Sequence, residues 1–145
     1  MMTVYLDNCM FNRPFDAQDS LRVRLETEAK LHIQEQIKQQ QLKLVWSYIL
    51  DFENAQNPFA ERRQAIARWR QLSYQDISAS PCVLTHARSL GEHGIKAKDA
   101  LHVACAIEAQ CDYFLTTDDQ LLKRLTASSM IVAMNPVDFI KVLES

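Results

Sequence analysis

Short apolar runs alternate with amphipathic helical segments along the whole chain, and this alternation limits the possible folds more than any other feature. The runs with the length and composition of buried strands are 3–6, 42–47, 74–78, 112–117 and 130–134. The segments with helical spacing of apolar residues are 19–40, 48–55, 57–70, 81–93, 99–110, 119–125 and 136–143, and residues 8–17 are expected to form a loop. This order favours an α/β fold with a parallel sheet and helices on both of its faces.

The length of the chain fits one domain. Its 145 residues, 48% of them hydrophobic, are enough to bury a substantial core. No linker, internal repeat or low-complexity segment divides the sequence, so we expect a single three-layer α/β/α domain over residues 1–145. The formal net charge of −2 provides no strong global field for nucleic acid, and any such contact must come from local basic patches.

Several common kinds of site are excluded by the residues that are missing. With only Gly91 and Gly94, the chain has no glycine-rich loop of the type that binds phosphate. Its four cysteines form no CxxC pair and have no histidine at zinc-ligand spacing, so we expect reduced, structural thiols. No apolar stretch reaches the length of a membrane span, and Asp7 comes too early for a signal peptide. These features predict a cytoplasmic protein.

Four carboxylates occupy positions where strands of a parallel sheet end or where the next helix begins. Asp7 and Asp118 directly follow apolar runs, Glu53 lies about a turn and a half into a helical segment, and Asp99 stands at the start of the most apolar helix. Parallel sheets bind ligands at the carboxyl ends of their strands. Two carboxylates about 5 Å apart repel by roughly 3 kcal/mol at an effective dielectric near 20. Because Mg²⁺ and Mn²⁺ prefer oxygen ligands, a divalent cation would remove this repulsion.

Each acid also has a simpler interpretation. Asp99 and Asp118 have the residue type and position of helix N-caps, and Glu53 fits a solvated helix face. Asp7 is harder to explain in this way because it follows an apolar strand directly. The joint placement of the four favours a metal site over four separate structural roles.

Three stretches of the sequence resemble a known family. They are 4–8 (VYLDN), 47–53 (SYILDFE) and 99–118 (DALHVACAIEAQCDYFLTTD), of which the last is the most specific. Together they resemble PIN-domain nucleases of the VapC toxin type, over nearly the whole chain. The resemblance implies a five-stranded parallel sheet with strand order 3-2-1-4-5 and the acids at its carboxyl edge.

The resemblance also implies a function. Proteins of this type are metal-dependent ribonucleases that hydrolyse RNA phosphodiester bonds with Mg²⁺ or Mn²⁺, and many are toxins inhibited by an antitoxin protein. Carried over by position, Asp7, Glu53, Asp99 and Asp118 would be both the catalytic and the metal-binding residues. The possible supporting residues are Asn8, Thr116, whose hydroxyl would hold the loop, and Asp119, which would orient a metal-bound water.

Basic residues near these acids are candidates for RNA contacts. Arg13 has the geometry to bind a phosphate with two hydrogen bonds, or it pairs with Asp16 or Asp19. Lys96 and Lys98 adjoin the start of the apolar helix and are the better candidates for binding the RNA backbone.

Two further expectations concern His102 and self-association. His102 lies one turn after Asp99, and a packed helix histidine is favoured over a site residue. The helical segment 19–40 carries an apolar stripe of Leu21, Leu25, Ala29, Ile33 and Ile37. With the family resemblance, this stripe predicts a homodimer.

Two other functions remain open. The first is a PIN-like binding or assembly module without nuclease activity. The second is a different acid-edged α/β protein, such as a phosphatase or a phosphoryl-transfer receiver. The Asp-x-Asp start expected of such phosphatases is absent, because Asp7 is followed by Asn8 and Cys9.

Overall fold

A computed structural model describes residues 1–145 and shows a five-stranded parallel sheet. The order across the sheet is β3-β2-β1-β4-β5, which confirms the predicted fold class and strand order. The strands are β1 (Thr3–Leu6), β2 (Lys43–Ser47), β3 (Gln75–Ile77), β4 (Tyr113–Leu115) and β5 (Ala133–Met134).

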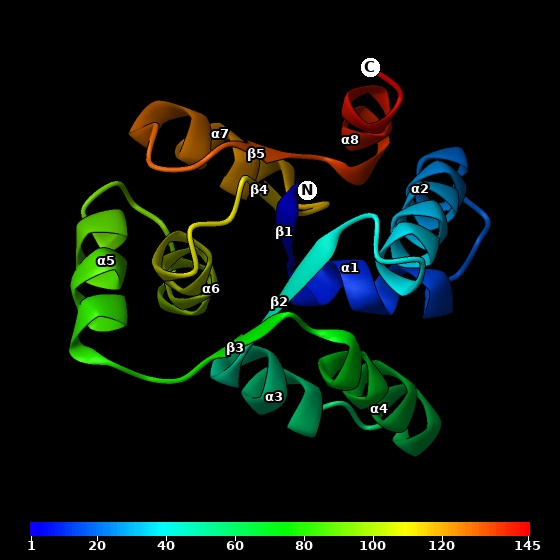
Figure 1. Cartoon of the computed structure of the whole chain (residues 1–145), viewed down its shortest axis with the longest axis horizontal. Coiled ribbons are helices and arrows are strands. Elements are labelled where there is room, and N and C mark those ends of the chain that lie inside the picture. The colour runs from blue at the N-terminus through cyan, green and yellow to red at the C-terminus, as the bar shows by residue number, and fades with distance from the viewer.

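Helices cover both faces of this sheet. Figure 1 shows α5 and α6 on one side of the strands and α2 and α8 on the other. The α-helices are α1 (Asn8–Asn12), α2 (Leu21–Lys38), α3 (Tyr48–Ala55), α4 (Ala60–Ala67), α5 (Pro81–Gly91), α6 (Ala97–Glu108), α7 (Asp119–Ser128) and α8 (Pro136–Leu143), and the 3-10 helices are η1 (Arg13–Phe15) and η2 (Arg68–Leu72). None of these helices is long and apolar enough to cross a lipid bilayer.

The centre of the core is β1. Its residues Val4, Tyr5 and Leu6 are completely buried, because strands pair on both sides and helices cover both faces. Tyr5 lies opposite Val45 of β2 and Phe114 of β4, and its ring stacks on the Phe114 ring with the centroids 5.4 Å apart. The register therefore fixes where β1 ends and where Asp7 leaves the sheet.

The predicted loop over residues 8–17 is wrong. Residues 8–15 instead form α1 and η1, and Met10 and Phe11 are buried in the core. The helix is too short to show a clear apolar period. It forms because Asp7 caps it from the end of β1 and because Met10 and Phe11 gain apolar burial.

The buried face of α2 differs from the apolar stripe predicted for it. Ala29, Ile33 and Ile37 are buried as expected, but Leu21 and Leu25 are 64% and 49% exposed. The buried face at the N-terminal end of α2 passes instead through polar residues, chiefly Glu26. The stripe is thus only partly used to cover the sheet.

The start of α6 and the end of α2 differ from their predicted positions. Helix α6 begins at Ala97, with Lys96 at the N-cap position, so Asp99 lies inside the first turn and is not the cap. Helix α2 ends after Lys38, where Gln40 adopts a left-handed conformation with φ of 61°. The helix therefore ends two residues before the boundary predicted at residue 40.

Candidate active site

Asp7 is the innermost of the four predicted acids. It lies at the carboxyl end of β1, where its backbone N–H donates to the Leu115 carbonyl of β4 at 3.0 Å. Its Oδ1 accepts from the backbone N–H of Asn8 at 2.8 Å, and its Oδ2 accepts from the Thr116 hydroxyl at 2.9 Å. Because β1 and β4 are paired, Thr116 lies beside Asp7 as the expected supporting residue.

Glu53 projects from α3 toward the same edge of the sheet. Its Oε1 hydrogen-bonds to Nε2 of His102, and its Oε2 accepts from Nδ2 of Asn8 at 3.2 Å. Burial disfavours ionisation of this carboxyl, but the hydrogen bond and charge of His102 outweigh it, so the pKa of Glu53 is lowered. Asn8 thereby joins the N-terminus of α1 to α3 as a second supporting residue.

His102 belongs to a buried chain of polar groups. Its Nδ1 lies 2.6 Å from the Tyr5 hydroxyl, and that hydroxyl lies 2.6 Å from the hydroxyl of Ser47. All three residues are completely buried, although their chain ends at Glu53, which is partly exposed. The imidazole is packed in the helix as expected, and it also contacts a predicted site residue, which the favoured interpretation of the sequence did not include.

The pKa of Asp99 is affected by burial and by the charges of the other three acids. Burial, followed by the charges of Asp7 and Asp118 and, more weakly, Glu53, raises the pKa of Asp99 to about 6, against an opposing effect of His102. Neither carboxyl oxygen of Asp99 accepts a hydrogen bond within the protein, and Asp99 and Asp118 line the same small hollow. Asp99 therefore lies within electrostatic range of the other three acids.

Asp118 has two roles available to it. Its Oδ1 caps α7 by accepting from the backbone N–H groups of Gln120 and Leu121 at 3.0 and 3.2 Å. The other oxygen, Oδ2, has no partner in the protein, and the side chain is exposed. The capping interpretation is thus correct, and it leaves one oxygen free for a ligand.

Arg13 and Asp119 are already engaged elsewhere. Arg13 donates to Asp16 at 3.0 Å and to the Thr117 hydroxyl at 2.9 Å, so the ion-pair alternative describes it better than a free phosphate ligand. Asp119 accepts from Nη1 and Nη2 of Arg22 at 2.7 and 2.8 Å. Its carboxylate is held by Arg22, which does not fit the expected role in orienting a metal-bound water.

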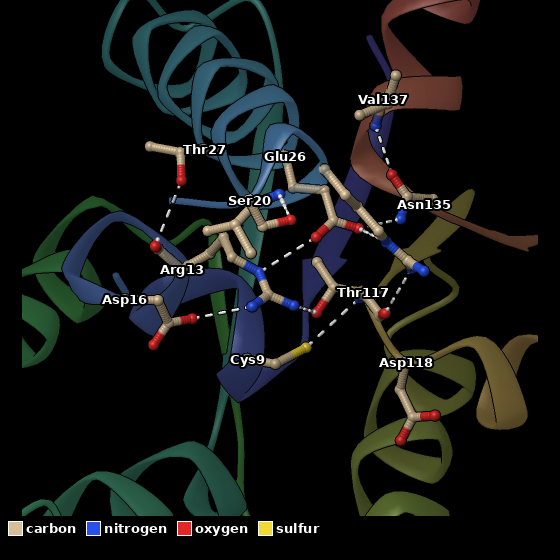
Figure 2. A network of polar contacts seen from close by, with 12 residues as sticks. Cys9, Arg13, Asp16, Ser20, Glu26, Thr27, Thr117, Asp118, Asn135 and Val137 are labelled. Atoms are coloured by element: carbon tan, nitrogen blue, oxygen red, sulfur yellow. Dashed lines mark hydrogen bonds and ion pairs between the residues drawn. The ribbon is translucent and has the colours of Figure 1, made fainter. Parts of the chain in front are cut away.

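A buried carboxylate that the sequence analysis missed connects these arginines. Glu26 of α2 lies 3.2 Å from Nε of Arg13 and 3.1 Å from Nε of Arg22, and it accepts from Nδ2 of Asn135 at 2.6 Å. Figure 2 shows Arg13 between Asp16, Glu26 and Thr117, with Asp118 on the adjoining loop. Arg22 also donates to the Thr117 carbonyl at 3.2 Å. Both arginines therefore hold the residue that precedes Asp118.

The remaining neighbours of the acids are Cys9, Lys96 and Lys98. Burial and the nearby Asp7 carboxylate raise the pKa of the Cys9 thiol to about 12, which excludes it as a nucleophile at neutral pH. Lys96 and Lys98 are exposed, and the charge of Lys98 favours ionisation of Glu53. The lysines thus lie where the sequence placed them, at the rim of the acid cluster.

The donor set suits a hard divalent cation. Oxygens of Asp7, Asp99 and Asp118 are the ligand type that Mg²⁺ and Mn²⁺ prefer, and the raised pKa of Asp99 reflects burial and, after it, the repulsion that a cation would relieve. No three Asp, Glu, His or Cys side chains are yet arranged closely enough to hold an ion as they stand. The residues therefore fit a cation in chemistry, and closing around it would require side-chain adjustment.

Comparisons with known proteins find similar solved structures. No family model and no curated protein matches the sequence. One similar solved structure is VapBC2 from Rickettsia felis bound to a DNA fragment from their promoter, with a TM-score of 0.57 and 14% identity over 92% of this chain and 98% of that chain. Another is VapBC-1 from nontypeable Haemophilus influenzae, with a TM-score of 0.59 and 15% identity over 93% of this chain and 98% of that chain.

At such low identity the likeness is informative about the fold. Both matches cover nearly the full length of the chain and of its counterpart, so they concern the whole domain. The strand order and the all-parallel sheet agree with the expectation from the sequence resemblance. The chain has the VapC-like PIN-domain fold.

Proposed function

We propose that this protein is a metal-dependent ribonuclease that hydrolyses RNA phosphodiester bonds with Mg²⁺ or Mn²⁺. One observation carries the proposal: burial, followed by the charges of Asp7 and Asp118 and more weakly that of Glu53, raises the pKa of Asp99 at the carboxyl edge of the sheet. Helix capping does not account for all four acids, because only Asp7 and Asp118 cap helices. A cation between a phosphate and these acids explains why the cluster is there.

Each acid has a distinct part in this proposal. Asp7, Asp99 and Asp118 would hold the ion, with Asp7 fixed by Thr116 and Asp118 fixed by its cap. Glu53, oriented by His102 and Asn8, would complete the acidic site. A bound divalent cation supplies charge neutralisation and a more acidic water for hydrolysis. Lys96 and Lys98 at the rim would attract the RNA backbone.

The proposed partners follow from the same comparison. The two similar structures are VapBC complexes, and we infer that this chain is likewise a toxin with an antitoxin. A basic antitoxin side chain would enter the acid cluster in place of the cation, because the same negative potential attracts both.

Exposed Leu21 and Leu25 on α2 support a homodimer. Light scattering and co-purification with the product of a neighbouring gene test these two inferences. Function in the cytoplasm is part of the proposal.

Cleavage of RNA tests the activity. Wild type and Asp7→Asn are incubated side by side with a mixed RNA pool, with Mg²⁺, with Mn²⁺ or with a chelator. Asp19→Asn is the matched control, because Asp19 is exposed and makes no hydrogen bond or ion pair. We expect cleavage by wild type and the control with either metal, none with the chelator, and loss of cleavage in Asp7→Asn.

A second candidate function is a PIN-like binding module without nuclease activity. It is favoured by the engagement of both Glu53 oxygens and by the lack of a preformed group of three ligands. Metal-independent RNA binding without cleavage, unchanged in Asp7→Asn, would support this alternative.

A further inference from the structure

A cavity apart from the acid cluster lies where residues of α1, η1, α2, α4 and η2 meet. Its volume is about 140 Å³, and most of its lining residues are apolar, among them Phe11, Phe15 and Trp69. Figure 1 shows α1 between α2 and α4. None of the four acids lines this cavity. It has room for one small apolar molecule, since an apolar cavity of roughly 150 Å³ accommodates benzene.

A buried lysine without a polar partner belongs to the wall of this cavity. Lys30 of α2 is 3% exposed, and its Nζ forms no hydrogen bond and no ion pair. Nζ lies 5.4 Å from the centroid of the Phe11 ring and 5.7 Å from that of the Trp69 ring. Because both rings line the cavity, the amine lies beside its walls. Lysine is almost never buried unless it is paired, so this position is unusual.

The amine is not closed off within the core. Its Nζ has no partner and yet is not one of the completely enclosed polar atoms without a partner, so it keeps some accessible surface. Lys30 itself lines the cavity, and so do Phe15 and Leu31, which are 37% and 46% exposed. The cavity therefore opens to solvent, and a small molecule inside it comes within reach of Nζ.

The amine is also a nucleophile at neutral pH. Burial, followed by the charge of Lys38, lowers the pKa of Lys30 to about 7, and no carboxylate pairs with the ammonium to keep it charged. A large share of Lys30 is therefore neutral at pH 7.5, whereas a solvated lysine with a pKa near 10.4 is almost wholly protonated. Only the neutral amine has the lone pair that attacks a carbonyl carbon.

We propose that Lys30 is a covalent modification site for a small apolar aldehyde, which enters this cavity and forms an imine with Nζ. The lone pair of Nζ attacks the carbonyl carbon, and one N–H proton moves to the carbonyl oxygen to give a carbinolamine. The second N–H proton then leaves with the hydroxyl as water. The apolar walls favour this product because the imine is neutral, and they disfavour a charged adduct such as a carbamate. The inference does not depend on the proposed ribonuclease function.

Reductive trapping of the imine tests this inference. The full-length protein is incubated at pH 7.5 with butanal and sodium cyanoborohydride, which converts an imine to a stable secondary amine. Peptide mass spectrometry then gives the rate of labelling at each lysine. We expect Lys30 to be labelled about tenfold or more faster than Lys141, an exposed lysine of α8, because far more of Lys30 is neutral.

Filling the cavity gives a second measurement. Ala65 of α4 lines the cavity, and Ala65→Leu should slow the labelling of Lys30 about threefold or more without changing that of Lys141, because the larger side chain takes up the free space. Ala60→Leu is the matched control, since Ala60 is exposed on the same helix and does not line the cavity. It should leave both rates unchanged. If Ala65→Leu does not fold, the comparison of Lys30 with Lys141 in wild type still decides the outcome.

The inference is overturned if Lys30 is labelled no faster than Lys141, the result expected of an amine that aldehydes do not reach. Equal slowing of Lys30 labelling by Ala65→Leu and Ala60→Leu overturns it as well, because the aldehyde would then not react from the cavity. An aldehyde too large for the cavity, such as pyrene carboxaldehyde, provides the last comparison. If it labels Lys30 as fast as butanal does, the cavity is not the binding site.

Discussion

Nε2 of His102 hydrogen-bonds to Oε1 of Glu53, and this bond joins α6 to α3 across the carboxyl edge of the sheet. Both ring nitrogens of His102 have a partner, because Nδ1 lies 2.6 Å from the Tyr5 hydroxyl while Nε2 contacts the Glu53 carboxylate. The Tyr5 hydroxyl also shares a hydrogen bond with the Ser47 hydroxyl, 2.6 Å away. The position of Glu53 thus depends on buried groups from β1, β2 and α6.

Substituting His102 should destabilise the protein. In His102→Ala the Tyr5 hydroxyl and the Glu53 carboxylate each lose a partner, and a cavity is left in a fully buried place. We expect a loss of about 2–4 kcal/mol in the free energy of unfolding, measured by urea denaturation. His32→Ala is the control, because His32 is exposed and makes no hydrogen bond. Equal midpoints for the two variants would show that the buried chain contributes nothing.

Removing Glu26 should have a comparable effect. Glu26 is buried against Arg13 and Arg22, and Glu26→Ala leaves both guanidiniums without this carboxylate. Arg13 keeps Asp16 and Arg22 keeps Asp119, so the expected loss is about 1–3 kcal/mol, from the lost hydrogen bonds to charged groups. The loss is measured as a shift in denaturation midpoint. Glu28→Ala is an exposed change on the same helix, and it should change the free energy of unfolding by less than about 0.5 kcal/mol.

Asp99→Asn should stabilise the protein in the presence of a chelator. The folded pKa of Asp99, about 6, lies above its ordinary value of 3.8, so folding takes up a proton between these values and stability falls as pH rises through this window. Above pH 6 the charged carboxyl therefore opposes folding. After allowance for solvent screening we expect the variant to gain about 1–2 kcal/mol at pH 7.5.

Thermal unfolding at two pH values checks the sign of this effect. The gain of Asp99→Asn should disappear below pH 4, where the carboxyl is protonated in both the folded and the unfolded chain. A variant that is less stable than wild type at pH 7.5 without metal would contradict the claim that the acids repel one another.

Lys30 should make stability depend on alkaline pH. Burial, followed by the charge of Lys38, lowers the pKa of Lys30 to about 7 from 10.5, and its ammonium faces the rings of Phe11 and Trp69 at 5.4 and 5.7 Å. The unfolded chain therefore binds more protons between pH 7 and 10.5, and the Lys30 contribution to stability rises with pH across that window.

The comparison of Lys30→Met with wild type isolates this contribution. The variant should be more stable at pH 6 by about 2–4 kcal/mol, and its advantage should shrink toward pH 10. Lys141→Met, at an exposed position, should show no such trend. Denaturation series across pH measure both differences. An advantage of Lys30→Met that is the same at every pH would mean that Lys30 is not forced to lose its proton.

The strands could be predicted from sequence because their signal is local. Leu42–Ser47 and Tyr113–Thr117 are short, largely apolar runs, and a strand buried on both faces needs no more than that. The order of the strands in the sheet does not follow from any local sequence pattern. Only the family resemblance predicted it. Helix α1 could not be predicted, because five residues give no period and its stability comes from packing.

The site was predictable in part for the same reason. Asp7 follows β1 directly and Asp118 lies three residues beyond the end of β4, so their place at the edge of the sheet follows from the strands. The contact of His102 with Glu53 depends on how far α6 and α3 slide along the sheet, which no local pattern encodes. Glu26 had a weak signal: a carboxylate lies on the α2 face that is shared with Lys30 and Ile33. Without knowledge of where α2 packs, that signal cannot be separated from a solvated residue.

The central claim is that the four carboxylates act as one cation site, and the binding of Mn²⁺ tests it most directly. Metal-free wild type, Asp99→Asn, Asp118→Asn and the Asp19→Asn control are titrated with Mn²⁺, and the free ion is followed by electron paramagnetic resonance. Wild type and the control should bind Mn²⁺ saturably and equally. The two site variants should bind about tenfold or more weakly, because each removes a charged ligand. Equal Mn²⁺ affinity in all four proteins, or no saturable binding by wild type, would contradict the account.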